Sequence, residues 1–202
     1  MKEVMVVRFL RVIIMASGLS RRFGTNKLFA PVNGQPMYCS VLNNVSTFFK
    51  NHPDAGIGIV VSAYEEILRE ADQLGLTAID NANPEEGQAN SIKIGLAWPL
   101  KDDFVKHEAA VFLTADQPWL RPETLSDFML AARSTPAGFL CASAKEVSGS
   151  PVSFDQKYYP ELFDLTGDGG GKAVMKRHLE DVDYFDINSN ELRDVDVPQD
   201  IV

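Results

Sequence analysis

Cysteine is scarce in this chain of 202 residues, which contains only Cys39 and Cys141. The two residues lie far apart and lack the spacing of a metal site, so we interpret them as reduced thiols of a cytoplasmic protein. The sequence therefore gives no reason to expect a disulfide framework or a metal centre built on cysteine.

An excess of positive charge and a long apolar run are also missing. The formal net charge is -9, which argues against nucleic acid as a partner because binding to phosphate backbones needs a basic face. No apolar stretch reaches the length of a membrane span, so we expect no membrane partner. The apolar N-terminal run is interrupted by Arg8 and Arg11 and lacks a cleavage site of small residues, so we do not interpret it as a signal peptide.

The composition that is present is ordinary for a globular protein, with 45% hydrophobic and 23% charged residues. A chain of this length can bury a sizeable core, but it is short for two domains. We therefore expect residues 1–202 to form a single domain.

Segments typical of strands and of helices alternate along the chain. Apolar, β-branched runs predict strands, whereas apolar residues three and four positions apart predict helices. The predicted strands cover residues 4–15, 56–62, 76–81, 108–116, 138–144, 151–154 and 181–187. The predicted helices cover residues 36–50, 63–75, 90–98, 121–133 and 167–179, with Pro36 in the first turn of the first one. This alternation predicts an α/β fold of three layers with a mostly parallel central sheet.

Ligands of such sheets bind beyond the carboxyl ends of the strands. Three loops at strand ends are polar, and they cover residues 16–27, 81–91 and 114–119. In the first loop Gly18 lets the backbone approach a ligand, and Arg22 and Lys27 add positive charge to an anion site of N–H groups. This set suits a triphosphate, although the Gly–Lys pair of a P-loop is absent and Gly18 and Gly24 are too far apart for a dinucleotide fingerprint. The alternative interpretation is a basic, solvated surface loop.

The third loop, with the sequence LTADQPWL, places Asp116 at the end of the most apolar predicted strand. A carboxylate near phosphates is typical of a magnesium site, in which substrate oxygens and waters complete the coordination shell. The alternative is that Asp116 only forms a turn before Pro118.

Five segments resemble, in order, the motifs of the MobA-like nucleotidyltransferases. IIMASGLSRRFGTNKL resembles the signature L-A-A-G-x-S-x-R-x-G-x-x-K, GQANSIKIGL the base-side segment, and LTADQP the metal-binding D-Q-P. GDGGGK and DVDVPQD resemble G-D-x-G-A-R and D-x-D-T-P-E-D of the molybdenum cofactor cytidylyltransferase branch. The motifs cover nearly the whole chain. The resemblance implies a Rossmann-like fold and a magnesium-dependent transfer of a nucleotidyl group from a nucleoside triphosphate, with release of pyrophosphate.

The resemblance also implies which residues form the site. The nucleotide would be bound by Ala16, Ser17, Gly18, Arg22, Lys27, Gly87 and Ser91. Of these, Arg22 and Lys27 would meet the phosphates, and together with Asp116 they would be the catalytic residues. Asp116 and Asp196 would hold Mg²⁺.

The late GDGGGK segment would bind the acceptor through Gly167 and Asp168. Asp168 has an alternative role as the cap of the helix that follows it, which we favour. The sequence departs from the family pattern at Ser17, at residues 170–172 and at Val197, and the late departures bear on the acceptor rather than on the chemistry.

Nucleotidyl transfer of this kind needs no histidine, because the attacking phosphate oxygen is already ionised and catalysis can consist of positioning and charge neutralisation. His52, His107 and His178 fall away from the three polar loops. We therefore expect them to be surface residues.

The late segment favours the cytidylyltransferase branch, and Ser17 stands where the guanylyltransferase branch usually has glycine. The resemblance thus implies CTP and the molybdenum cofactor as substrates, with a molybdoenzyme or its chaperone as a partner. The alternatives are a guanylyltransferase that uses GTP, a sugar- or polyol-phosphate nucleotidyltransferase, and a non-catalytic protein that delivers the cofactor.

Overall fold

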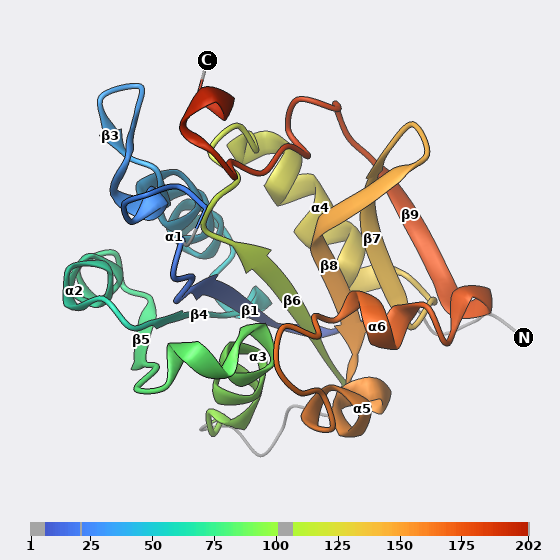
Figure 1. Ribbon diagram of the computed structural model, residues 1–202. Helices are drawn as coiled ribbons and strands as arrows, with labels where there is room; N and C mark the ends of the chain where they lie inside the picture. The colour runs from blue at the N-terminus through green and yellow to red at the C-terminus, as the bar shows by residue number, and fades with distance from the viewer. Residues whose placement is uncertain (1–6, 21, 101–106, 202) are drawn as a thin grey trace, which may run out of the picture.

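The centre of the molecule is a sheet of seven strands (Figure 1). The computed structural model describes residues 7–20, 22–100 and 107–201. The strands of the sheet are β1 (Phe9–Ala16), β4 (Gly56–Ser62), β5 (Thr77–Asp80), β6 (Glu108–Thr114), β7 (Phe139–Ala144), β8 (Val147–Asp155) and β9 (Val182–Asp186). Their order across the sheet is β5-β4-β1-β6-β8-β7-β9.

The sheet is mostly parallel, as the sequence predicts. Strand β1 pairs in parallel with β4 and β6, β4 with β5, and β7 with β9. Only β8 among the described strands of this sheet runs the other way, antiparallel to both β6 and β7. The carboxyl ends of β1, β4 and β6 therefore meet at one edge, where the polar loops emerge.

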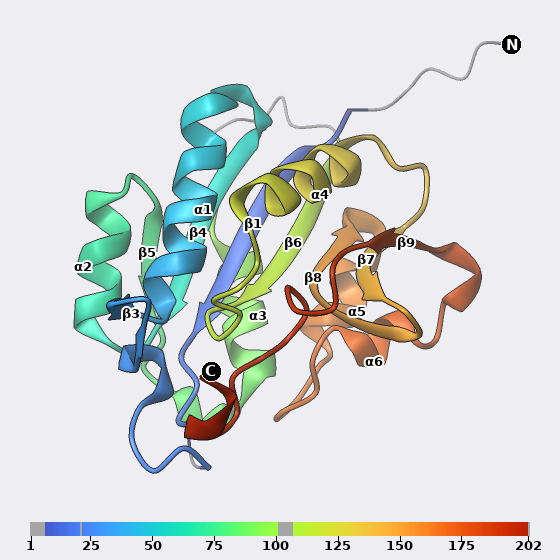
Figure 2. The same ribbon diagram turned by 90° about the horizontal axis from the view of Figure 1, so that it is seen from above.

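Helices cover both faces of the sheet, which gives the expected three layers (Figure 2). They are α1 (Tyr38–Asn51), α2 (Glu65–Gln73), α3 (Gln88–Ala97), α4 (Pro122–Ser134), α5 (Tyr159–Phe163) and α6 (Lys172–Met175). Because side chains of a strand alternate between faces, Val12 and Ile14 of β1 share one core cluster with α1, α2 and α4. Ile13 belongs to the second cluster, which contains residues of α3, α5 and α6. The α/β prediction is confirmed.

Helix α1 begins at Tyr38, two residues later than predicted. Pro36 lies instead in β3 (Gln35–Pro36), which forms a two-stranded hairpin with β2 (Pro31–Val32). The turn between these strands is Asn33–Gly34, and both residues have positive φ values, 50° and 81°. Asn-Gly is the commonest pair for such a tight hairpin turn, so this feature was readable in the sequence and was missed.

The last third of the chain also differs from the prediction. The predicted strand 151–154 is the end of the longer strand β8, and the predicted helix 167–179 shrinks to α6, which starts after the glycines because glycine disfavours helix. Residues 4–6 of the first predicted strand lie outside the described residues. Both cysteines are free. Of the helices in the described ranges, none is long and apolar enough to cross a membrane.

Candidate active site

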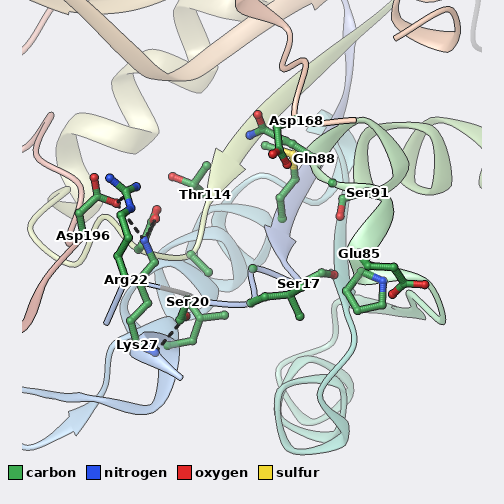
Figure 3. A pocket seen from close by; sticks show the side chains of 18 residues that line it. Ser17, Ser20, Arg22, Lys27, Glu85, Gln88, Ser91, Thr114, Asp168 and Asp196 are labelled. Carbon is green, nitrogen blue, oxygen red and sulfur yellow. Dashed lines mark hydrogen bonds and ion pairs between the residues drawn. The ribbon is translucent and has the colours of Figure 1, made fainter. Parts of the chain in front are cut away.

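A cavity of about 380 Å³ lies at the carboxyl ends of β1 and β6. Its wall is formed by the loop after β1, the start of α3, the end of β6 and the C-terminal segment (Figure 3). The sequence-predicted site residues that line it are Ser17, Gly18, Arg22, Lys27, Gly87, Ser91, Asp116, Asp168 and Asp196. Ala16 does not line it, because its side chain is fully buried in the core at the end of β1. Gly167 also stays outside the wall, directly behind Gly87.

The loop after β1 is held in place by hydrogen bonds of its own. The backbone N–H of Lys27 donates to Ser20 Oγ over 3.1 Å, and Asn26 Oδ1 accepts from the N–H of Leu28 over 3.1 Å. Tyr64 fixes the other end of the loop by donating its hydroxyl to the carbonyl of Gly18 over 2.9 Å.

Several backbone N–H groups of this loop are available to bind an anion. Within the described residues, the N–H groups of Gly18, Leu19 and Ser20 donate no hydrogen bond. Gly18 and Leu19 are exposed and Ser20 is half-buried, and all three line the cavity. Successive free N–H groups of this kind bind anions such as phosphates.

The two predicted cations have different environments. Lys27 is nearly buried, with 13% of its side chain exposed, and its Nζ lies 2.6 Å from Asp116 Oδ2, 2.7 Å from the Val195 carbonyl and 3.5 Å from Asp196 Oδ1. Arg22 has 74% of its side chain exposed and pairs with Asp196 Oδ1 over 3.0 Å. Lys27 is thus a fixed charge, whereas Arg22 lies at the rim, where solvent screens its ion pair.

Asp116 carries an unused acceptor. Its Oδ2 accepts from Lys27, but its buried Oδ1 has no hydrogen-bond partner among the described residues. Side chains that only form a turn accept from the backbone two residues on, and residue 118 is a proline without an N–H. The geometry thus gives Asp116 a contact with Lys27 and no local turn bond.

The carboxylates at Lys27 fit a magnesium ion. Mg²⁺ is usually held by one or two carboxylates, with substrate phosphates and waters as the other ligands. Asp116 with its unpartnered oxygen and Asp196 supply this number. In residues 7–20, 22–100 and 107–201 no group of three or more His, Cys, Asp or Glu side chains is arranged to hold a metal ion.

A third carboxylate stands next to this pair. The pKa of Asp194 is raised to about 6, because protein atoms displace water from its carboxyl group and because Asp116 repels its negative charge. Gln117 and Lys27 act in the opposite direction by hydrogen bonding and attraction. Residue 194 nevertheless keeps considerable contact with solvent. Lys27 therefore sits among several negative groups, which is a setting that favours a bound cation.

The side of the cavity formed by α3 depends on a close approach of two glycines. Gly87 precedes α3 with a φ of 82°, and a Cβ added to it would lie 2.5 Å from the carbonyl of Gly167. The Gly167 carbonyl in turn accepts from the N–H of Ala89 over 3.0 Å. The late GDGGGK segment is thereby packed against the start of α3.

The favoured prediction that Asp168 caps a helix is wrong. Helix α6 begins at Lys172 with Gly171 as its N-cap, and no described side chain caps it. Asp168 lies instead on the cavity wall next to Gln88 (Figure 3). Lys172 does not line the cavity and donates to the carbonyl of Ser148 over 2.7 Å.

Sequence reasoning missed Thr114 and Gln88, which both line the cavity. Thr114 ends β6, and its buried Oγ1 lacks a hydrogen-bond partner within the described part of the chain. The available signal was a polar residue two positions before Asp116 in an apolar strand. Of the described residues that line the cavity, none is a histidine.

Comparisons with known proteins identify the family and the fold of the chain. The sequence profile of the MobA-like NTP transferase domain matches residues 12–182. The purine catabolism protein PucB of Bacillus subtilis (strain 168) is 26% identical over 205 residues, which cover 93% of this chain and 91% of the relative. A nucleotidyl transferase from Methanothermobacter has a similar structure, with a TM-score of 0.75 and 17% identity over 95% of this chain and 94% of that one. The crystal structure of Rv0371c from Mycobacterium tuberculosis H37Rv is also similar, with a TM-score of 0.73 and 20% identity over 96% of each chain.

The profile spans most of the chain, and the two solved structures show the same fold. Four of the five motifs that suggested this family lie in the matched region, and the fifth, DVDVPQD, covers residues 194–200 beyond its end. The chain belongs to the MobA-like NTP transferase family and is a nucleotidyltransferase.

Proposed function

We propose that this nucleotidyltransferase transfers CMP from CTP to a phosphate group of the molybdenum cofactor, molybdopterin-bound molybdenum, and releases pyrophosphate. The observation that carries the proposal is the Lys27–Asp116 pair, in which Asp116 Oδ1 has no hydrogen-bond partner among the described residues and which lines the same cavity as the N–H groups of the loop after β1. This arrangement supplies donors for the phosphates and an oxygen for a metal ion in one cavity.

The residues of the chain would act mainly by positioning and charge. The free N–H groups of Gly18, Leu19 and Ser20 bind the triphosphate. The Lys27 ammonium group has three N–H donors. Two of them donate to Asp116 Oδ2 and to the Val195 carbonyl, so the third can donate to a phosphate oxygen. The exposed Arg22 adds a mobile charge for the departing pyrophosphate.

Asp116 and Asp196 would hold Mg²⁺, which supplies neutralisation of phosphoryl charge when bound. An oxygen of the acceptor phosphate forms a bond to the α-phosphorus of CTP. The bond between the α-phosphorus and the oxygen that bridges the α- and β-phosphates breaks, and pyrophosphate leaves with that oxygen. Because the attacking oxygen is already ionised, no general base is required. Fixing the two reactants in line is then the main task of the cavity.

The choice of CTP rests on the wall near Ser17. The Ser17 side chain is buried, and its hydroxyl donates to the Val61 carbonyl over 3.1 Å, so its position is fixed. It occupies space that a glycine would leave open to a purine. We therefore expect CTP to be preferred over GTP.

The acceptor would lie beside Asp168, whereas Gly167, which does not line the cavity, would only support this segment from behind Gly87. The carboxylate of Asp168 lies on the cavity wall, and it can accept hydrogen bonds from the N–H groups of a pterin ring. The product would pass to a molybdoenzyme or its chaperone in the cytoplasm.

A thermal-shift panel of CTP, GTP, ATP and UTP with Mg²⁺ tests nucleotide choice. Pyrophosphate release with and without molybdenum cofactor tests the reaction, and mass spectrometry of a mixture with equal CTP and GTP identifies the product. A cytidylated cofactor is the expected result. An excess of guanylated product overturns the choice of base, a sugar- or polyol-phosphate product overturns the acceptor, and nucleotide binding without pyrophosphate release indicates a delivery protein.

A further inference from the structure

A buried amide lies behind the α3 side of the cavity. Asn81 directly follows β5 and is buried, with 1% of its surface exposed. Its backbone N–H donates to the Ser62 carbonyl over 2.9 Å. Asn81 does not line the cavity. Its side chain instead contacts Ser91, which is 3% exposed and does line the cavity.

The backbone fixes which way the Asn81 amide points. Its Oδ1 lies 3.2 Å from the backbone nitrogen of Asn83 and 2.8 Å from Nδ2 of Asn90. A backbone N–H can only donate, so the atom that faces it must be the oxygen. The Asn81 Nδ2 group is therefore the one that lies 3.2 Å from Ser91 Oγ.

This orientation uses one of the two acceptor lone pairs of the Ser91 hydroxyl. Because an amide nitrogen only donates, Ser91 Oγ must accept from Asn81, and its own hydrogen is left free. Within the described ranges, the Ser91 hydroxyl donates to no protein group. A buried donor without a partner is costly, and the open cavity is where a partner can be found.

We propose that Asn81 is a positioning residue that makes Ser91 a hydrogen-bond donor to an acceptor atom of the nucleobase, a ring nitrogen or a carbonyl oxygen. The inference rests on the proposed function, because it takes the α3 side of the cavity as the base side. Cytosine presents two adjacent acceptors, O2 and N3. A base that presents an N–H group at this position would have to use the second lone pair of Ser91 Oγ and would leave the Ser91 hydrogen without a partner, so it would bind less well.

Asn81→Asp tests the proposal with little change of shape. A carboxylate still accepts from Asn83 and Asn90, but it cannot donate to Ser91, so the Ser91 hydroxyl turns to the carboxylate and the base loses its donor. We expect the Kd for CTP to rise about 5- to 30-fold, the scale of one lost hydrogen bond. The Kd for inorganic triphosphate, which has no base, should stay within a factor of two of its own wild-type value. In turnover, KM for CTP should rise while kcat is retained, since the contact is made equally in the ground and transition states.

Three controls separate positioning from charge and from folding. Ala82→Asp places the same charge on the exposed neighbouring residue without contact to Ser91, and it should leave the ratio of the two Kd values at the wild-type level. Ser91→Ala should weaken CTP binding by itself, and Asn81→Asp in the Ser91→Ala background should cause no further loss. Thermal melts of all variants show whether each one folds.

The outcomes distinguish this inference from the proposed function. An unchanged Kd for CTP in a folded Asn81→Asp variant overturns the role of Asn81 and leaves the transferase function in place. Equal losses for CTP and inorganic triphosphate, or a full additional loss in the Ser91→Ala background, overturn it as well. A wild-type protein that binds inorganic triphosphate but none of the four nucleoside triphosphates overturns both.

Discussion

Lys27 has a structural role in this protein and a second role in the proposed function. Its ammonium group is nearly buried and contacts Asp116 and the Val195 carbonyl, so it fastens the end of β6 to the C-terminal segment. In the proposed function the same group also binds a phosphate oxygen. Stability and nucleotide binding should then be coupled at this position.

Lys27→Ala should lower both nucleotide affinity and turnover. It should also lower the free energy of unfolding by about 1.5–3 kcal/mol, because a hydrogen bond to a charged group is lost and Asp116 is left unpaired. Calorimetric titration with CTP and urea unfolding measure the two effects. An unchanged affinity for the nucleotide in calorimetry contradicts the phosphate role, whatever happens to stability.

Asp116→Asn removes the charge and keeps the shape. We expect magnesium-dependent turnover to fall by about two orders of magnitude or more, the scale for loss of one electrostatic stabiliser of a transition state. Steady-state pyrophosphate release at saturating Mg²⁺ is the measurement. Wild-type turnover in this variant would show that Asp116 has no part in holding a metal ion.

At the scale of elements, Asp181 joins the start of β7 to the segment before α5. Its Oδ1 accepts from the N–H of Gly138 over 2.9 Å, and its Oδ2 accepts from the Tyr158 hydroxyl over 2.7 Å. Lys157 pairs with the same oxygen over 2.7 Å. Burial opposes the ionisation of this carboxyl, but the hydrogen bonds from Lys157, Tyr158 and Gly138 outweigh it and lower the pKa to about 2.

This shift predicts the sign of a pH dependence. The pKa of Asp181 in the folded state lies below the unfolded value of 3.8, so its contribution to stability is present above about pH 4 and is lost as the pH falls through about 2. Asp181→Asn should cost about 1–2 kcal/mol at pH 7, after allowance for partial exposure. Urea unfolding of both proteins at several pH values should show this difference shrinking between pH 4 and 2. A difference that stays constant over this range contradicts the assignment.

At the scale of the whole molecule, the C-terminal segment returns to the carboxyl edge of the sheet and completes the cavity (Figure 2). Val195 is fully buried, and its N–H donates to the Asp116 carbonyl over 3.0 Å. Asp200 Oδ2 accepts from the N–H groups of Asp196 and Val197 over 2.8 and 2.9 Å. These bonds hold Asp196 near Lys27.

Deletion of residues 194–202 should leave the sheet intact, because β9 ends at Asp186. The free energy of unfolding should fall by about 1.5–3 kcal/mol, the value of one buried valine side chain. Turnover should fall by about two orders of magnitude with the loss of Asp196. Circular dichroism, urea unfolding and pyrophosphate release check these three expectations. A truncated protein with full activity would exclude Asp196 as a ligand of the catalytic metal.

Much of the fold could be predicted because it depends on local patterns. The apolar, β-branched runs at β1, β4 and β6 are strands buried on both faces, and such strands carry their signal in composition alone. The apolar pattern does not predict the structure where glycines set the backbone conformation or where helices and strands are only a few residues long. The Asn33–Gly34 hairpin and the shortened α6 are the two clearest cases.

The sequence by itself determined the family, the α/β fold and half of the 18 residues that line the cavity, because order along the chain and strand-end position are properties of sequence. Only the tertiary structure decided how those residues interact. It turned Asp168 from a predicted cap into a cavity residue, and it brought Lys27, Asp116 and Asp196 together across 80 residues or more. It also engaged the Ser91 hydroxyl as an acceptor of the buried Asn81 amide, whose orientation the Asn83 N–H and the Asn90 side chain hold. The physical reason is that hydrogen-bond direction and charge pairing depend on distances across the fold, which spacing along the chain does not contain.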